Sequence, residues 1–134
     1  MSKILNMLMA FVMSFGISGS NVNPSDIPEN SNFEVHFIDV GQADSALIEC
    51  DGETMMIDGG NVADSNVVAA YLKKEDVTEL NYVVCSHAHE DHVGGLSGAL
   101  SVTKADNIYA PKTKANTKAY KNFKKKAEEQ NVEI

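Results

Sequence analysis

The stretch YVVCSHAHEDHVGG, residues 82–95, holds three of the four histidines of this 134-residue chain. The apolar run that precedes them is typical of a buried β-strand. His87 and His89 are two positions apart, so in an extended segment both imidazoles point to the same side and can converge on one ion. Asp91 and His92 follow where the chain should turn into a helix, which aims that pair at a second ion nearby. The stretch therefore predicts a metal site at the end of a strand.

The residue types in this motif also indicate the metal. Imidazole nitrogens and a carboxylate oxygen suit Zn²⁺, and also Mn²⁺ or Fe. We expect Gly94 and Gly95 to allow the tight turn that places Asp91 and His92. The spacing H-x-H-x-D-H arises by chance in this composition with a probability of roughly 2 in 10,000. The alternative is a set of surface histidines that bind nothing, which the strand before the cluster and the glycine pair after it disfavour.

Strand-like and helix-like patterns alternate along the rest of the chain. The period-2 and buried-strand patterns cover residues 33–40, 45–50, 53–58, 80–86 and 107–111. The helical patterns cover residues 65–74, 94–100 and 116–130, and NVEI at 131–134 is predicted to begin one more strand. Asp51-Gly52 is a hairpin turn signal, and Ser65 is a plausible helix cap. This alternation indicates a mixed α/β layered fold.

The charge is strongly acidic, with a formal net charge of −8. Seven lysines nevertheless fall between Lys112 and Lys126. The acidic balance argues against broad nucleic-acid binding by charge alone, although a bound cation would reverse the field locally. We interpret the lysine-rich helix as a solvated face, with Ala119, Phe123 and Ala127 turned inward. Contact with a nucleic-acid backbone is the alternative.

The first 32 residues differ in composition from the rest. Residues 1–20 carry one early lysine, an apolar run from Ile4 to Ile17 and then small residues, which is the layout of a secretory signal peptide. The run is short and interrupted, so it would make a poor transmembrane span. Residues 21–32 read as a linker. We expect a secreted protein that is not stably inserted in a membrane, and an N-terminal membrane anchor is the alternative.

The two cysteines, Cys50 and Cys85, both end apolar strand-like runs. We predict two buried free thiols. Export would permit a disulfide, but the sequence does not show whether the two Cα atoms lie close enough to bridge. Cys85 lies two residues before His87, and we do not expect it to be a metal ligand.

Three segments together resemble a known family. H-x-H-x-D-H after an apolar strand is similar to the signature of the metallo-β-lactamase superfamily. FIDVGQADSALIE (37–49), MMIDGG (55–60) and YVVCSHAHEDHVGGL (82–96) resemble the metallo-β-lactamase-like domain of ComEC-type competence proteins, which take up DNA. That family commonly has D-V-G-Q-G-D in the first segment. Ala43 replaces its second glycine, and a positive φ at Ala43 would strain the loop.

The resemblance implies a site and a fold. His87 and His89 would ligate the first of two divalent ions, and Asp91 and His92 the second, with Asp91 also orienting a bridging water as the catalytic residue. Asp58 would support the site by hydrogen bonds, although a plain turn aspartate is an equal alternative. The fold implied is the first half of an αβ/βα four-layer sandwich, truncated at the C-terminus.

We also predict roles for four polar residues outside the histidine motif. Asp39, Gln42 and Asp44 would be outer-sphere groups or, more in keeping with their loop, caps. For His36 we expect a packed or solvent-facing side chain rather than a ligand.

The function that the resemblance implies is that of a metal-dependent hydrolase. The resemblance favours a phosphodiester substrate, either a small molecule or a nucleic acid, while β-lactams or other esters remain alternatives. A catalytic zinc normally has three protein ligands, whereas this motif offers two for each ion. We therefore expect weak metal binding and little hydrolysis by the chain alone. The alternative function is an inactive half-domain that binds metal weakly or forms a homodimer.

Overall fold

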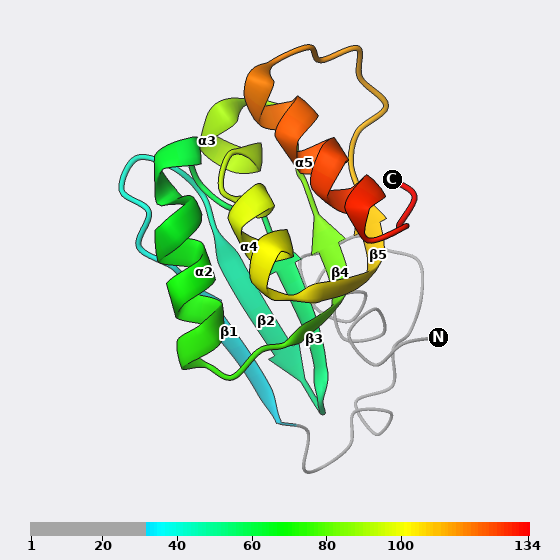
Figure 1. Cartoon of the computed structure of the whole chain (residues 1–134). Helices are drawn as coiled ribbons and strands as arrows, with labels where there is room; N and C mark the ends of the chain where they lie inside the picture. Colours follow the sequence, from blue (N-terminus) through cyan, green and yellow to red (C-terminus); the bar gives the residue numbers. More distant parts are fainter. Residues whose placement is uncertain (1–31) are drawn as a thin grey trace, which may run out of the picture.

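The computed structural model describes residues 32–134, which form one five-stranded sheet with helices packed on it (Figure 1). The strands lie side by side in sequence order as β1 (Phe33–Phe37), β2 (Ala46–Cys50), β3 (Glu53–Ile57), β4 (Glu79–Val84) and β5 (Lys104–Tyr109). The predicted mixed α/β class is thereby confirmed. The expected signal peptide and residues 21–31 of the linker lie outside the described residues. Within residues 32–134, no helix is long and apolar enough to cross a membrane.

Strand direction decides where the loops meet. β1 and β3 each run antiparallel to β2, whereas β3, β4 and β5 run parallel to one another. The β2–β3 turn has positive φ at Asp51 (50°) and Gly52 (86°), which confirms the predicted hairpin. Every strand except β2 therefore points the same way. The segments that follow β1, β3, β4 and β5 all leave the sheet at one edge.

The helices follow the apolar spacing of the sequence. They are α2 (Ser65–Lys74), α3 (Glu90–Val93), α4 (Leu96–Val102) and α5 (Lys118–Glu129), with a 3-10 turn η2 (Val62–Asp64) before α2. The helix predicted over 65–74 is confirmed. Its N-cap is Asp64 rather than Ser65, because η2 brings the chain into helical geometry one residue early. For α5, the Thr117 side chain caps the start by accepting a hydrogen bond from the Tyr120 backbone N–H (3.2 Å).

Two predicted elements differ from the structure. The helix expected over 94–100 is present as α4 but begins at Leu96 with Gly95 as its N-cap, and an unpredicted short helix, α3, precedes it. Residues 131–134 form a turn and coil rather than a strand. Asn131 has φ 59° and terminates α5, and its backbone N–H donates to the Glu128 carbonyl (3.0 Å). A local C-cap therefore determines the backbone there.

The main core lies between the sheet and α2, α4 and α5, which cover the same face (Figure 1). Fully buried side chains come from both layers, namely Leu47, Met56, Val68, Leu72, Leu80, Val83, Leu96 and Phe123. A smaller cluster of Ile48, Cys50 and Met55 lies on the opposite face of β2 and β3, because side chains alternate between the two faces of a strand. The lysines of α5 remain on its outer side, since Ala119, Phe123 and Ala127 are buried as predicted.

Candidate metal centre

The predicted site residues meet at the edge of the sheet where the parallel strands end. Asp58 immediately follows β3, and His87 lies three residues beyond β4. Asp91 and His92 lie in α3, and Asp44 lies in the loop after β1. In open α/β sheets this edge is where binding sites form, because the loops from several strands converge there.

Backbone hydrogen bonds lock these loops together. The N–H of Gly59 donates to the carbonyl of His92 (2.7 Å), and the N–H of Gly95 donates to that of Gly60 (3.1 Å). The N–H of Asp44 donates to the Asp91 carbonyl (3.2 Å). These bonds hold the segments after β1, β3 and β4 at fixed distances. The side chains of the site are thus placed by main-chain contacts and not by their own flexibility.

Gly94 and Gly95 do not form the tight turn that the sequence predicted. Gly94 and Gly95 both have ordinary right-handed helical φ values, −56° and −80°. A Cβ on Gly95 would lie 1.8 Å from the Gly59 carbonyl oxygen, and one on Gly94 would lie 2.3 Å from the Val62 nitrogen. The pair is therefore required for close backbone approach rather than for a tight turn.

Asp58 is the most enclosed carboxylate of the site, with a side chain only 4% exposed. Its Oδ1 accepts from the Ser86 backbone N–H (2.8 Å), and its Oδ2 accepts from the Ser86 hydroxyl and lies 2.8 Å from His92 Nδ1. Its backbone has φ 56°, a left-handed conformation that aspartate tolerates. The geometry is that of a group that orients a histidine; its role in metal binding stays a prediction.

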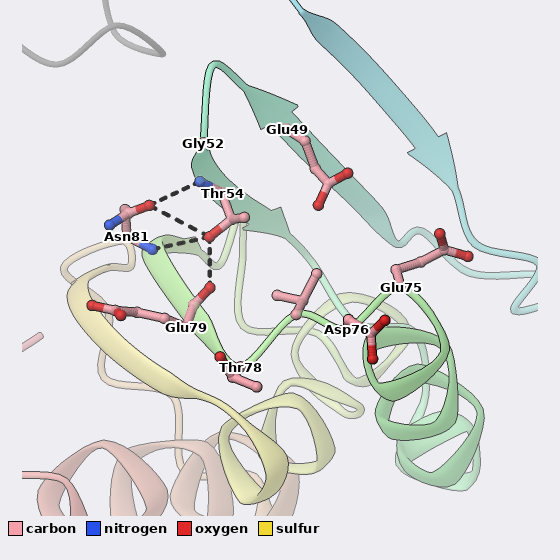
Figure 2. Close-up of a pocket in the computed structure, with 9 residues that line it drawn as sticks. Glu49, Gly52, Thr54, Glu75, Asp76, Thr78, Glu79 and Asn81 are labelled. Carbon is pink, nitrogen blue, oxygen red and sulfur yellow. Dashed lines mark hydrogen bonds between the residues drawn. The ribbon is translucent and has the colours of Figure 1, made fainter.

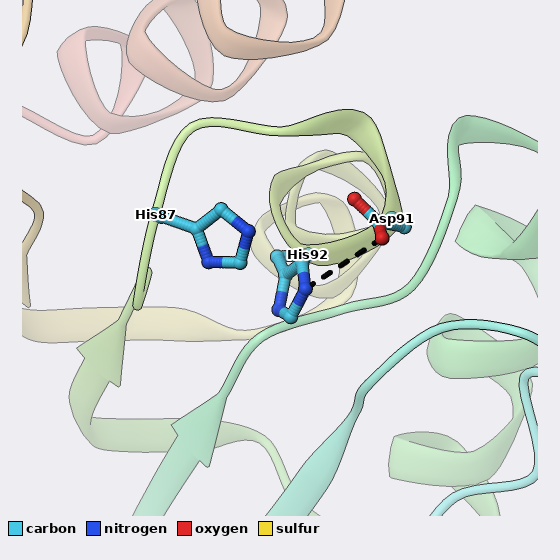
Figure 3. A group of neighbouring side chains, drawn as sticks. All are labelled: His87, Asp91 and His92. Atoms are coloured by element: carbon cyan, nitrogen blue, oxygen red, sulfur yellow. Dashed lines mark ion pairs between the residues drawn. The ribbon is translucent and has the colours of Figure 1, made fainter.

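His87, Asp91 and His92 form a compact donor group (Figure 3). One ligand atom from each residue lies within 4.8 Å of the other two. His92 Nε2 is 3.7 Å from Asp91 Oδ2, and its Nδ1 is bonded to Asp58. When Nδ1–H donates to that carboxylate, the Nε2 lone pair is free for a cation, which is the usual arrangement of a metal-bound histidine. Two nitrogens and an oxygen at this spacing fit a divalent ion such as Zn²⁺.

The arrangement of the histidines differs from simple pairing along the sequence. His89 is the exposed N-cap residue of α3 and stacks edge-on to His87, with ring centroids 4.9 Å apart. The rings of His87 and His92 are closer, at 3.7 Å. In this structure His87 thus lies with Asp91 and His92, while His89 lies at the solvent-exposed rim of this group. Which residue serves which ion stays a prediction.

Sequence reasoning gave too little weight to two neighbours of this group. Asp44 Oδ2 is 3.6 Å from His92 Nε2, on a side chain that is 75% exposed. The Ser86 hydroxyl bonds Asp58 and lies 3.1 Å from His87 Nδ1. A serine at the end of a strand is too common in sequences to predict a contact with a metal centre. The D-V-G-Q-A-D segment did carry a signal for Asp44, because its loop returns to the same edge of the sheet.

The other residues of that loop have local roles. Asp39 caps the loop by accepting from the Gly41 backbone N–H (3.2 Å), as expected. The residue with positive φ is Gly41 (65°), and Ala43 is not among the non-glycine residues with positive φ. The replacement of the family's second glycine by Ala43 therefore strains nothing.

Both cysteines are buried thiols outside any disulfide, as predicted. The Cys85 thiol donates to the His87 carbonyl (3.1 Å). Burial, reinforced by the nearby Asp58 carboxylate, raises the pKa of Cys85 to about 12. Cys85 does not lie in either group of potential metal ligands among the described residues, and its buried thiol serves as a packing group.

Comparisons with known proteins agree with this geometry. A family model described as the metallo-beta-lactamase superfamily matches residues 38–129. Among solved structures, the metallo-beta-lactamase SMB-1 bound to 2-mercaptoethanesulfonate is 26% identical, with a TM-score of 0.48, covering 55% of this chain and 29% of that one. The chemotaxis sensor ODP, solved as a peroxy diiron species, is 24% identical, with a TM-score of 0.49, covering 62% and 36%. A search among curated proteins found no match.

The family match alone carries the assignment, since both structural likenesses have TM-scores below 0.5. The chain spans about a third of the length of these two solved proteins. The family match includes the donor group and Asp58, and it extends over most of the described residues. The chain therefore belongs to the metallo-beta-lactamase superfamily, whose members are mostly metal-dependent hydrolases that bind divalent metals, typically zinc.

Proposed function

We propose that this chain carries part of a divalent-metal centre of a hydrolase that cleaves phosphodiesters. The observation that supports this most directly is the convergence of His87, Asp91 and His92, with the Asp58 carboxylate 2.8 Å from His92 Nδ1. The proposal includes His89 as a further ligand, because its ring lies against His87 at the same rim. Two ions are proposed, with Zn²⁺ the best fit to the donors and Mn²⁺ or Fe as alternatives.

The chemistry divides between the ions and the chain. Bound divalent ions would supply Lewis acidity and lower the pKa of a water molecule toward neutrality. Asp91 is half-exposed, so its carboxylate is available both to bind a cation and to accept a hydrogen bond from an attacking water. Asp58 and Ser86 hold His92 in place from the buried side.

A phosphodiester substrate is favoured by charge as well as by the ComEC-like segments. Lys112 and Lys114 are exposed and lie in the segment after β5, at the same edge of the sheet as Asp91. Exposed lysines at the same end of the sheet would attract a phosphate backbone toward the candidate metal centre. We propose a nucleic acid or a small phosphodiester as the substrate, with β-lactams as the alternative.

A zinc-loaded sample of the full chain provides the test of this function. Hydrolysis of bis(4-nitrophenyl) phosphate and of short single-stranded DNA is measured beside hydrolysis of nitrocefin. Metal-dependent phosphodiester turnover that Asp91→Asn abolishes would support the proposal. Zinc binding without turnover of any of the three substrates would favour the inactive module instead.

Ligand count favours that alternative for the chain alone. With two predicted ligands for each ion, against three in catalytic zinc sites, we predict that residues 21–134 retain less than one metal ion per chain after dialysis. Metal analysis by mass spectrometry checks this, and retention of two ions would contradict it. Asp44 is the residue that would raise the count, given its 3.6 Å separation from His92.

Homodimer formation is part of the alternative. Phe33, Val35 and Phe37 are exposed on one face of β1, and Tyr109 is exposed on β5. Apolar side chains in such a row are typical of association surfaces. Sedimentation of the purified chain would show a dimer or a monomer.

We also propose that residues 1–20 direct export and are then removed, with a retained membrane anchor as the alternative. N-terminal sequencing of the protein recovered from the medium and from membranes distinguishes the two.

A further inference from the structure

A second group of metal-binding side chains lies on the first two strands, away from the histidine motif. Glu34 and His36 are on β1, two residues apart, and Glu49 is on β2 directly opposite Glu34 in the antiparallel register. His36 is opposite Leu47, which is fully buried in the main core. The three side chains therefore share the helix-covered face of the sheet, where Tyr71 of α2 packs against His36.

This arrangement places a ring nitrogen between two carboxylates. Two carboxylates directly opposite each other on one face of a sheet repel. His36 Nε2 lies between them, 3.6 Å from Glu34 Oε2 and 3.5 Å from Glu49 Oε2. It is buried and makes no hydrogen bond, although polar atoms inside proteins are almost always paired. Nε2 is thus within ion-pairing distance of both carboxylates but hydrogen-bonded to neither, and one metal ion shared by the three groups would satisfy all of them.

The distances favour shared coordination over a hydrogen bond. A charge-assisted hydrogen bond from a protonated imidazole to a carboxylate has N···O of about 2.7–2.9 Å. Two ligands of one tetrahedral zinc ion, with bonds of about 2.0–2.2 Å, are separated by about 3.3–3.6 Å. Both separations from His36 Nε2 match the second value. The three ligand atoms all lie within 4.8 Å of one another.

The other ring nitrogen of His36 has the partner that a metal-bound histidine needs. Nδ1 is 2.8 Å from the Tyr71 hydroxyl, and the two rings meet edge to face at 78°. A proton on Nδ1 donated to that hydroxyl leaves the Nε2 lone pair directed at the two glutamates. Outer-sphere hydrogen bonds of this kind orient metal-bound histidines.

An acidic pocket gives this group access to solvent. Glu49 also lines a cavity of about 350 Å³, together with Glu75, Asp76 and Glu79 (Figure 2). Carboxylates in a concave surface raise the local concentration of cations. The side chain of Glu34 is 55% exposed. An ion could therefore reach the group without opening the core.

We propose that Glu34, His36 and Glu49 bind one divalent metal ion, with Zn²⁺ best suited to one imidazole and two carboxylates. Tyr71 is a positioning residue for this site. The ion joins edge strand β1 to β2 and stabilises the contact with α2. The proposal is independent of the hydrolase function, since it uses none of the residues of the histidine motif.

Nitrogen-15 NMR of the histidine rings, recorded on the full chain during titration with Zn²⁺, tests it. Each histidine gives its own signals, so His36 is read separately from His87, His89 and His92. We expect the Nε2 signal of His36 to move to a metal-bound position. Mg²⁺, which prefers oxygen ligands, should leave that signal in place. An unchanged His36 signal at zinc concentrations that saturate the chain would overturn the proposal.

Variants read at the same signal sharpen the test. Glu49→Gln should weaken zinc binding at His36 by at least about tenfold, and Tyr71→Phe by about tenfold, as for loss of an outer-sphere partner. Glu79→Gln is the matched control, because Glu79 lines the same cavity but lies outside the group, and it should leave the affinity within about twofold. Equal affinity in Glu49→Gln and the parent chain would contradict the assigned ligands. Failure of the hydrolase proposal would appear at His87 and His92 instead.

Discussion

Asp58 illustrates how a single residue can serve both backbone and site. Its left-handed φ of 56° turns the chain sharply after β3 and aims the carboxylate back at the segment after β4. Both oxygens are then used, one by the Ser86 backbone N–H and one by the Ser86 hydroxyl and His92. A conformation that costs backbone energy persists where the surrounding hydrogen bonds over-determine it. Asp58 therefore lies where it can orient His92, and it is not one of the three residues of the donor group His87, Asp91 and His92.

Asp58→Asn is expected to lower the zinc affinity of the centre by about 10–100-fold. The amide keeps the size of the side chain but can offer an N–H to His92 Nδ1, which would leave the proton on Nε2. Competition with a chromophoric chelator measures the affinity. Ser86→Ala is the control, since it removes a bond to Asp58 while keeping the Asp58–His92 contact, and it should have a smaller effect. Equal affinities in Asp58→Asn and the parent chain would remove Asp58 from the site.

At the scale of elements, the site depends on the junction between the loop after β3 and the start of α4. Gly59, Gly94 and Gly95 each face backbone atoms of the opposite segment there, and a Cβ on Gly59 would lie 2.4 Å from the Leu96 backbone nitrogen. The backbone hydrogen bonds of Gly59 and Gly95 pass through the same junction. Because backbone packs directly on backbone, the junction has no space for added atoms, and a small change there would shift Asp58 and His92 together.

Gly95→Ala should destabilise the fold by about 3 kcal/mol or more, because its Cβ would overlap the Gly59 carbonyl oxygen at 1.8 Å. Urea unfolding followed by circular dichroism measures the loss. Gly52→Ala is the comparison, since nothing lies within 4 Å of its Cβ and only its φ of 86° is strained. It should cost about 1–2 kcal/mol. A smaller loss for Gly95→Ala than for Gly52→Ala would show that the junction relaxes.

For the molecule as a whole, stability comes from one layer of helices on one face of the sheet. Among the described residues, Phe123 of α5 is the largest fully buried side chain, and α4 and α5 pack against each other on the helix-covered face of the sheet. Phe37 on the edge strand β1 is 86% exposed. The same residue type thus has opposite roles at the two sides of the fold, because only the helix-covered face removes it from water.

Phe123→Ala should cost about 3–5 kcal/mol of folding free energy through lost burial and the cavity that remains. Phe37→Ala should change it by no more than about 0.5 kcal/mol. Thermal unfolding of the two variants, measured side by side, makes the comparison. A large loss for Phe37→Ala would show that the β1 face is covered in solution.

The sequence by itself determined the class of fold and the approximate positions of most strands and helices, and it singled out the candidate donor residues. Periodicity carries these, because apolar spacing of two or about 3.6 residues depends only on which side of an element is buried. The hairpin at Asp51-Gly52, the helix over 65–74 and the inward face of α5 were all readable in this way. The ends of elements could not be predicted as well. The separate helix α3 and the C-cap at Asn131 arise from local hydrogen bonds, which apolar spacing does not encode.

Only the tertiary structure decided which of these residues meet. Strand direction brings the loops after β1, β3 and β4 to one edge, which places Asp44 and Ser86 beside His92 and sets His89 at the rim. The register of β1 on β2 likewise places Glu34 opposite Glu49, with His36 between their carboxylates. These contacts join residues that are distant along the chain, and such distances are set by how the strands pair and pack rather than by spacing in the sequence.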